Sequence, residues 1–82
     1  MNIRIKFFAG VADVVGHSEL VFSPAEKSLT IAGLWQRLCD GYPPLGAYSG
    51  RILSARNHRF ARPDDVLVDG DEIAFFPPVS GG

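Results

Sequence analysis

The sequence is poor in the residues on which many protein functions depend. It has one cysteine, Cys39, so this chain alone cannot form an internal disulfide, a four-cysteine iron-sulfur cluster or a zinc site of several thiolates. A single cysteine fits a reducing compartment. No apolar run approaches the roughly 20 residues of a membrane-spanning helix, and the amino terminus alternates instead of forming a signal-peptide core. We therefore expect a cytoplasmic protein that uses neither a membrane nor a metal.

The chain also lacks an excess of charge of either sign. A formal net charge of -1 creates no long-range field that would gather nucleic acid or an anionic membrane, so neither is an expected partner. Half of the basic residues nevertheless fall in one short segment, at Arg51, Arg56, Arg59 and Arg62. This group is consistent with a patch for an acidic partner surface or with the solvated side of two strands.

The remaining composition is that of one packed domain, with 46% apolar and 21% charged residues in 82 positions. From Asn2 to Phe8 the side chains alternate, which predicts a half-buried strand with Ile3, Ile5 and Phe7 on its inner face. A second strand is predicted from Glu19 to Ser23, and the two form a hairpin. Gly10 and Gly16 bracket the connection, where we expect an irregular or one-turn helical segment over residues 11–15.

One substantial helix is predicted in the middle of the chain. Thr30 is a suitable cap, and the apolar positions that follow have the spacing of one buried helical face: Ile31, Leu34, Trp35 and Leu38. Gly41, followed by Pro43 and Pro44, ends this helix.

Short strands and turns make up the last third. A strand is predicted from Ile52 to Arg56, with a turn at Asn57-His58 and a return strand at Arg59-Phe60. The last strand runs from Glu72 to Phe76. This ββαβ(β)β order is that of the β-grasp (ubiquitin-like) fold, an α+β class with a mixed sheet and one main helix on one face. We predict a β-grasp domain over residues 1–76 and an extended C-terminal carrier tail over residues 77–82.

No internal active site is evident. His17 and His58 are isolated, and Cys39 lies at the end of the apolar helical stripe, which favours a buried thiol over a nucleophile. A group of carboxylates flanks predicted turns and is interpreted as turn-forming and solubilising: Asp64, Asp65, Asp69, Asp71 and Glu72. The sequence contains no glycine-rich phosphate loop of the expected length.

The chemistry is therefore expected at the carboxyl end, Pro77-Pro78-Val79-Ser80-Gly81-Gly82. The two prolines stop the strand and stiffen its exit, and the six residues reach on the order of 20 Å when extended. Two glycines without side chains can enter a narrow channel in a partner. A partner that adenylates the carboxylate of Gly82 makes it an electrophile, so that sulfide can displace the nucleotide and leave a thiocarboxylate. The plainer alternative is a frayed chain end.

The segment from Leu67 to Gly82, with its AFFPPVSGG ending, resembles the end of molybdopterin synthase small subunits, which are ubiquitin-like sulfur carriers. Residues 5–9 (IKFFA), Tyr42-Pro43 and Asn57 are similar to that family as well. The resemblance covers nearly the whole chain and is loose in the middle third. Arg56 departs from it, because the family usually has an apolar residue before the asparagine.

This resemblance implies a set of partners. A ubiquitin-activating-like adenylyltransferase uses ATP to adenylate Gly82, and a sulfur donor enzyme converts it to the thiocarboxylate. The large synthase subunit then takes the sulfur to convert cyclic pyranopterin monophosphate to molybdopterin, in a heterotetramer of two small and two large subunits. The chain itself is expected to bind no cofactor. Three alternatives stay open: a thiamine-type sulfur carrier, a ubiquitin-like modifier joined to lysines through Gly82, and a β-grasp interaction module without terminal chemistry.

Strand parity also predicts a partner surface. Phe8 and Phe76 face away from the core on two strands that are adjacent in a β-grasp sheet, and Phe60 on a neighbouring strand can join them. We predict that these aromatics, together with the tail from Pro77 through Ser80, bind the partners. The resemblance agrees, since family members dock through this face. The competing interpretation is that the tail or a loop covers Phe8 or Phe76.

Overall fold

A computed structural model describes residues 1–78, and residues 79–82 lie outside the described part. The described residues form a five-stranded sheet with two α-helices and a 3-10 helix. In chain order the elements are β1 (Ile3–Phe7), α1 (Ala9–Val15), β2 (Glu19–Phe22), α2 (Ile31–Gly41), η1 (Pro43–Tyr48), β3 (Leu53–Arg56), β4 (Arg59–Phe60) and β5 (Glu72–Phe76). The predicted β-grasp fold is confirmed.

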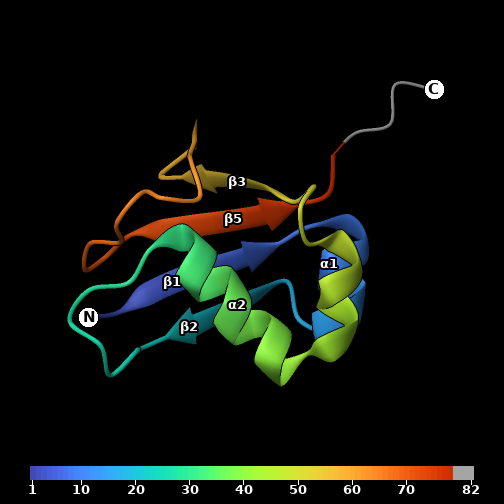
Figure 1. Ribbon diagram of the computed structural model, residues 1–82, viewed down its shortest axis with the longest axis horizontal. Coiled ribbons are helices and arrows are strands. Elements are labelled where there is room, and N and C mark those ends of the chain that lie inside the picture. The colour runs from blue at the N-terminus through green and yellow to red at the C-terminus, as the bar shows by residue number, and fades with distance from the viewer. Residues whose placement is uncertain (79–82) are drawn as a thin grey trace.

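The sheet has the strand order β2-β1-β5-β3-β4, so the first and last long strands lie side by side at its centre. Ile5 is paired with Leu20 of β2 on one side, antiparallel, and with Ile73 of β5 on the other, parallel. Figure 1 shows α2 lying across one face of the sheet, while α1 stands at the end where β1 and β5 finish. Within residues 1–78, no helix covers the opposite face, which we call the outer face. Within residues 1–78, no helix has the length and apolar character needed to cross a membrane.

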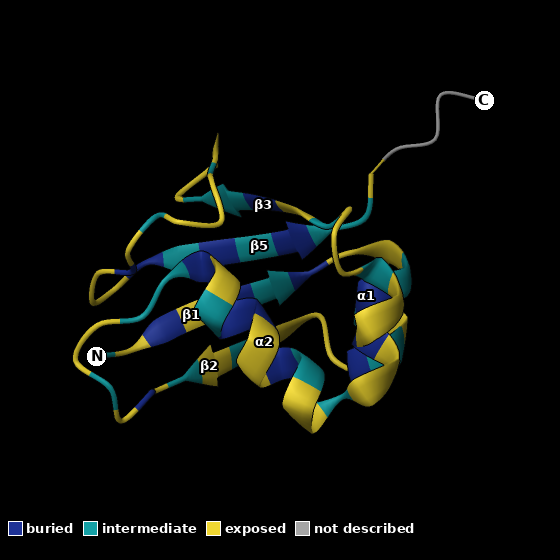
Figure 2. Cartoon of the chain, in the orientation of Figure 1, coloured by how far each residue is buried: buried dark blue, intermediate teal, exposed yellow. Residues whose placement is uncertain are grey.

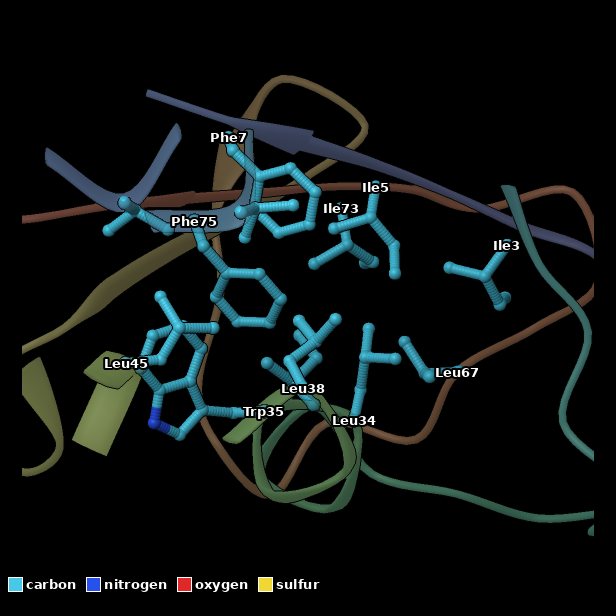
Figure 3. Close-up of a cluster of buried hydrophobic side chains, with 13 residues drawn as sticks. Ile3, Ile5, Phe7, Leu34, Trp35, Leu38, Leu45, Leu67, Ile73 and Phe75 are labelled. Carbon is cyan, nitrogen blue, oxygen red and sulfur yellow. The ribbon is translucent and has the colours of Figure 1, made fainter. Parts of the chain in front are cut away.

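The core lies between the sheet and α2. The alternation predicted for the first strand is confirmed, because Ile3, Ile5 and Phe7 are all buried. In Figure 3 their side chains, together with those of β5, point toward the side chains of α2. Trp35 packs on Phe75 with ring centroids 5.1 Å apart. Burial of large apolar side chains at about 25 cal/mol per Å² is therefore what holds α2 on the sheet.

The main helix begins as predicted. The side-chain oxygen of Thr30 accepts a hydrogen bond from the backbone N–H of Gly33 at 3.0 Å, which satisfies one of the free donors of the first turn. Figure 2 shows the buried face of α2 turned toward the sheet and the exposed face toward solvent. Pro43 and Pro44 do more than end this helix, because they open η1, which places Leu45 in the core.

The segment after β1 differs from the expected irregular connection. It is the seven-residue helix α1, which includes Gly10 and buries Val11 and Val15 one helical turn apart. The hydroxyl of Tyr48 occupies the space that a side chain at Gly10 would need, so this glycine belongs to a close packing contact and not to a loop. Gly16 ends the helix in a left-handed conformation, with a φ of 82°.

Asp71 forms a turn as predicted, but the interpretation of its side chain as solubilising was wrong. Asp71 is buried, and its carboxylate accepts hydrogen bonds from the side chain of Asn57 at 3.0 Å and from the backbone N–H of Val68 at 2.8 Å. The guanidinium of Arg56 lies 2.9 Å from the same carboxylate. Asp71 therefore joins the turn before β5 to the turn after β3, and it neutralises the arginine that replaces the expected apolar residue.

Candidate functional site

The outer face carries an open depression with a volume of about 430 Å³, which we call the aromatic pocket. It lies across β1, β5 and the β3–β4 turn. Its lining combines two aromatic rings and two alanines with three polar side chains: Phe8, Phe76, Ala55, Ala74, Lys6, His58 and Glu72. A small apolar floor with a polar rim is the usual composition of a protein docking site.

The aromatic side chains lie where strand parity places them. Phe8 is 49% exposed and Phe76 is partly buried, and both line the aromatic pocket. Phe60 is 82% exposed, and its ring centroid is 6.1 Å from that of Phe76. The structure thus brings the three together, and their role in binding partners stays a prediction.

Leu53 extends this apolar surface and was missed by sequence reasoning. It is paired directly with Phe76 and is 38% exposed, whereas the next residue, Ser54, is buried opposite Phe75. The polar side chain therefore points inward and the leucine outward, against the usual hydrophobic pattern. Only the register between β3 and β5 shows this, because the local sequence favours the opposite parity.

The polar rim of the aromatic pocket belongs to a group of charged and polar side chains centred on Glu72. Three basic side chains surround the carboxylate of Glu72, at nitrogen–oxygen distances of 3.8, 3.5 and 3.3 Å: Arg4, Lys6 and His58. Arg4 also pairs with Glu19 of β2 at 3.5 Å. The side chain of Glu72 is 19% exposed, whereas those of Arg4 and His58 are 60% and 81% exposed. Arg4 and Lys6 are therefore more exposed to solvent than the carboxylate of Glu72 that they share.

The predicted tail begins where β5 ends. Phe76 is the last residue of the strand, Pro77 is half-buried and Pro78 is exposed. The predicted carrier residues Gly82 and Gly81, and the predicted contact residues Val79 and Ser80, lie outside the described residues. Their roles, and the division into residues 1–76 and 77–82, remain predictions.

The other candidate groups do not form a second site. Cys39 is half-buried, with its sulfur 3.8 Å from the hydroxyl oxygen of Ser49. In residues 1–78, no cluster of three or more histidine, cysteine or acidic side chains could hold a metal ion. The four arginines do not act as one group: Arg56 is paired with Asp71, and Arg51 lies over the ring of Tyr48 and donates to the carbonyl of Ala47.

Comparison with known proteins identifies similar sequences and similar folds. The ThiS family model matches residues 5–82. The molybdopterin synthase sulfur carrier subunit of Escherichia coli is 37% identical over 83 residues, covering 98% of this chain and 99% of that protein. The crystal structure of Haloferax volcanii small archaeal modifier protein 1 superposes with a TM-score of 0.83 at 26% identity, covering 95% of this chain and 98% of the other.

A chain from the complex of subunits 1 and 2 of the molybdopterin-converting factor of Helicobacter pylori has the same fold. Its TM-score is 0.68 at 22% identity, with full coverage of both chains. The chain therefore belongs to the ThiS family, and its full-length similarity is to the molybdopterin synthase sulfur carrier subunits.

Proposed function

We propose that this chain is the sulfur carrier subunit of a molybdopterin synthase and acts in the cytoplasm. The observation that carries the proposal is the full-length similarity to sulfur carrier subunits together with an aromatic pocket beside the strand that leads into the Pro77-Pro78 exit. The domain supplies a rigid docking surface. The reacting group is the carboxylate of Gly82.

The sulfur is loaded in two steps. An adenylyltransferase similar to ubiquitin-activating enzymes uses ATP to form an acyl adenylate at Gly82 and releases pyrophosphate. Sulfide from a sulfur donor enzyme then attacks the acyl carbon and displaces AMP, which leaves the thiocarboxylate. The chain needs no cofactor of its own for either step, because the adenylate is made and held by the partner.

Delivery requires that the domain remain outside while its terminus enters the large subunit. The apolar floor of the pocket and the ring of Phe60, which lies beside Phe76 at its edge, offer aromatic anchors of the kind that dominate docking interfaces. Because β5 runs through the centre of the sheet and ends at Phe76, docking at the pocket also positions the start of the tail. The large subunit then takes the sulfur to convert cyclic pyranopterin monophosphate to molybdopterin, and the carboxylate of Gly82 is regenerated.

A single-turnover assay tests this proposal. The thiocarboxylated chain is mixed with the large subunit and cyclic pyranopterin monophosphate, and the dithiolene product is measured. Product should form in proportion to the loaded carrier, with two carriers consumed per product. The unloaded chain is the matched control. Loaded carrier that gives no product above this control contradicts the proposal.

A second function is favoured by the similarity to small archaeal modifier protein 1. A modifier is joined through its terminal glycine to lysines of other proteins. An epitope-tagged chain expressed in its own cells should then appear in higher-mass species that resist denaturation. A pure carrier gives one free species, and this result would exclude the modifier function under the growth conditions used.

A further inference from the structure

The turn between β3 and β4 contains one residue that the fold does not explain. Arg56 is paired with Arg59, so the turn consists of Asn57 and His58 alone, with φ values of 50° and 71°. A two-residue hairpin turn with positive φ at both positions is type I′, in which the second position strongly favours glycine. His58 occupies that position despite its side chain.

Asn57 has a structural reason to be there. Asparagine tolerates the left-handed region, and its amide donates to the buried carboxylate of Asp71 while its carbonyl oxygen accepts from the backbone N–H of Glu72 at 2.9 Å. His58 has no comparable bond within the core. Its side chain is 81% exposed. A strained residue without a packing role is a candidate for function.

The imidazole of His58 lies on the rim of the aromatic pocket. Its Nε2 atom is 3.3 Å from Oε2 of Glu72, and the pocket that it lines also contains Phe8 and Phe76. The Nε2 atom is thus directed to Glu72, and the rest of the ring is left to whatever docks over the pocket. A charged imidazole donates from both nitrogens, whereas the neutral form donates from one and accepts at the other.

We propose that His58 is a docking residue whose imidazolium bridges Glu72 and a carboxylate on the large synthase subunit, so that docking tightens as the pH falls. The inference rests on the proposed function and names the chemistry of its partner surface. A carboxylate suits this position because Arg4 and Lys6, which both pair with Glu72, are more exposed to solvent than the carboxylate that they share. When His58 is neutral and its Nε2–H donates to Glu72, the other ring nitrogen, Nδ1, carries a lone pair instead of a proton. That lone pair repels a carboxylate of the partner.

Other charged groups surround His58 and set the background against which its charge acts. Glu72 faces it from β5, Lys6 and Arg4 reach the same carboxylate from β1, and Glu19 of β2 is linked through Arg4. On the strands of its own turn are Arg56, which is paired with Asp71, and Arg59. Of the groups in this set, histidine alone changes its ordinary charge between about pH 5 and pH 8.

The test measures the dissociation constant between the full chain and its large subunit at about pH 5.5 and about pH 8. The unmodified chain should bind roughly 3-fold to 10-fold more tightly at the lower pH than His58→Asn does, and the two should bind alike at the higher pH. Asparagine tolerates the left-handed region and cannot become charged. His17→Asn is the matched control, because His17 is exposed and lies outside the pocket, and it should behave like the unmodified chain.

A glycine variant separates docking from folding. His58→Gly should raise the melting temperature by roughly 4 °C, because the turn then has its preferred residue, and it should lose the same pH-dependent part of the affinity. If His58→Asn keeps the full pH response of the unmodified chain, the inference is overturned while the proposed function stands. If the unmodified chain does not bind the large subunit at either pH, the proposed function itself fails.

Discussion

Truncating Phe76 to alanine separates docking from folding because of where this ring lies. Phe76 is partly buried on the outer face, 6.1 Å from the Phe60 ring, whereas Phe7 on the inner face is 2% exposed. Phe7→Ala leaves a cavity in a closed core and should lower the free energy of unfolding by about 3 to 5 kcal/mol. Phe76→Ala loses partial burial and one ring pair, which should lower it by roughly 1 to 2 kcal/mol.

Phe76→Ala should cost less stability than Phe7→Ala but more affinity for the large subunit. Phe76→Ala and Phe8→Ala should each weaken binding to the large subunit by roughly 1 to 3 kcal/mol, which is roughly 5-fold to 150-fold in the dissociation constant. Isothermal titration calorimetry gives the affinity, and thermal melts of the same preparations give the stability. The reasoning is refuted if both outer-face variants bind like the unmodified chain, or if they destabilise the domain as much as Phe7→Ala does.

Three further predictions concern the tail and the buried carboxylate. Deleting Gly82 should abolish sulfur transfer and leave the melting curve unchanged, and a large fall in melting temperature would contradict a tail that contributes nothing to folding. Gly81→Ala should slow ATP–pyrophosphate exchange by the activating enzyme, because a methyl group adds bulk in a narrow channel and disfavours positive φ, so unchanged kinetics would mean a wider channel. Asp71→Ala should lower the free energy of unfolding in urea by about 1 to 3 kcal/mol, because it leaves the partly buried guanidinium of Arg56 and two hydrogen-bond donors without their acceptor. The exposed Asp64→Ala is its control and should change stability by less than about 0.5 kcal/mol.

Periodicity was sufficient to predict the long elements. The alternation of Ile3, Ile5 and Phe7 and the helical spacing that begins at Ile31 are direct consequences of one buried face, so β1 and α2 could be identified without any tertiary information. α1 and η1 were harder, since each is short and its glycine or prolines favour a loop. The two elements pack against each other where the hydroxyl of Tyr48 in η1 lies close to Gly10 in α1. No local sequence pattern reveals this tertiary contact.

The same distinction applies to the outer face. Strand parity predicted that Phe8 and Phe76 face away from the core, and the structure places both at one pocket. The exposure of Leu53 and the burial of Asp71 could not be predicted in this way. The first depends on the register of β3 against β5. The second depends on three donors that converge from the end of β3, the β3–β4 turn and the turn before β5.

The central claim is that Gly82 carries sulfur, and the intact mass of the protein tests it most directly. The full chain is incubated with its activating enzyme, ATP and a sulfur donor, and its mass is compared with that of the same chain lacking Gly82. We expect a mass gain equal to the exchange of one oxygen for one sulfur in the full chain and none in the shortened one. An unchanged mass of the full chain under conditions in which the activating enzyme turns over ATP would contradict it.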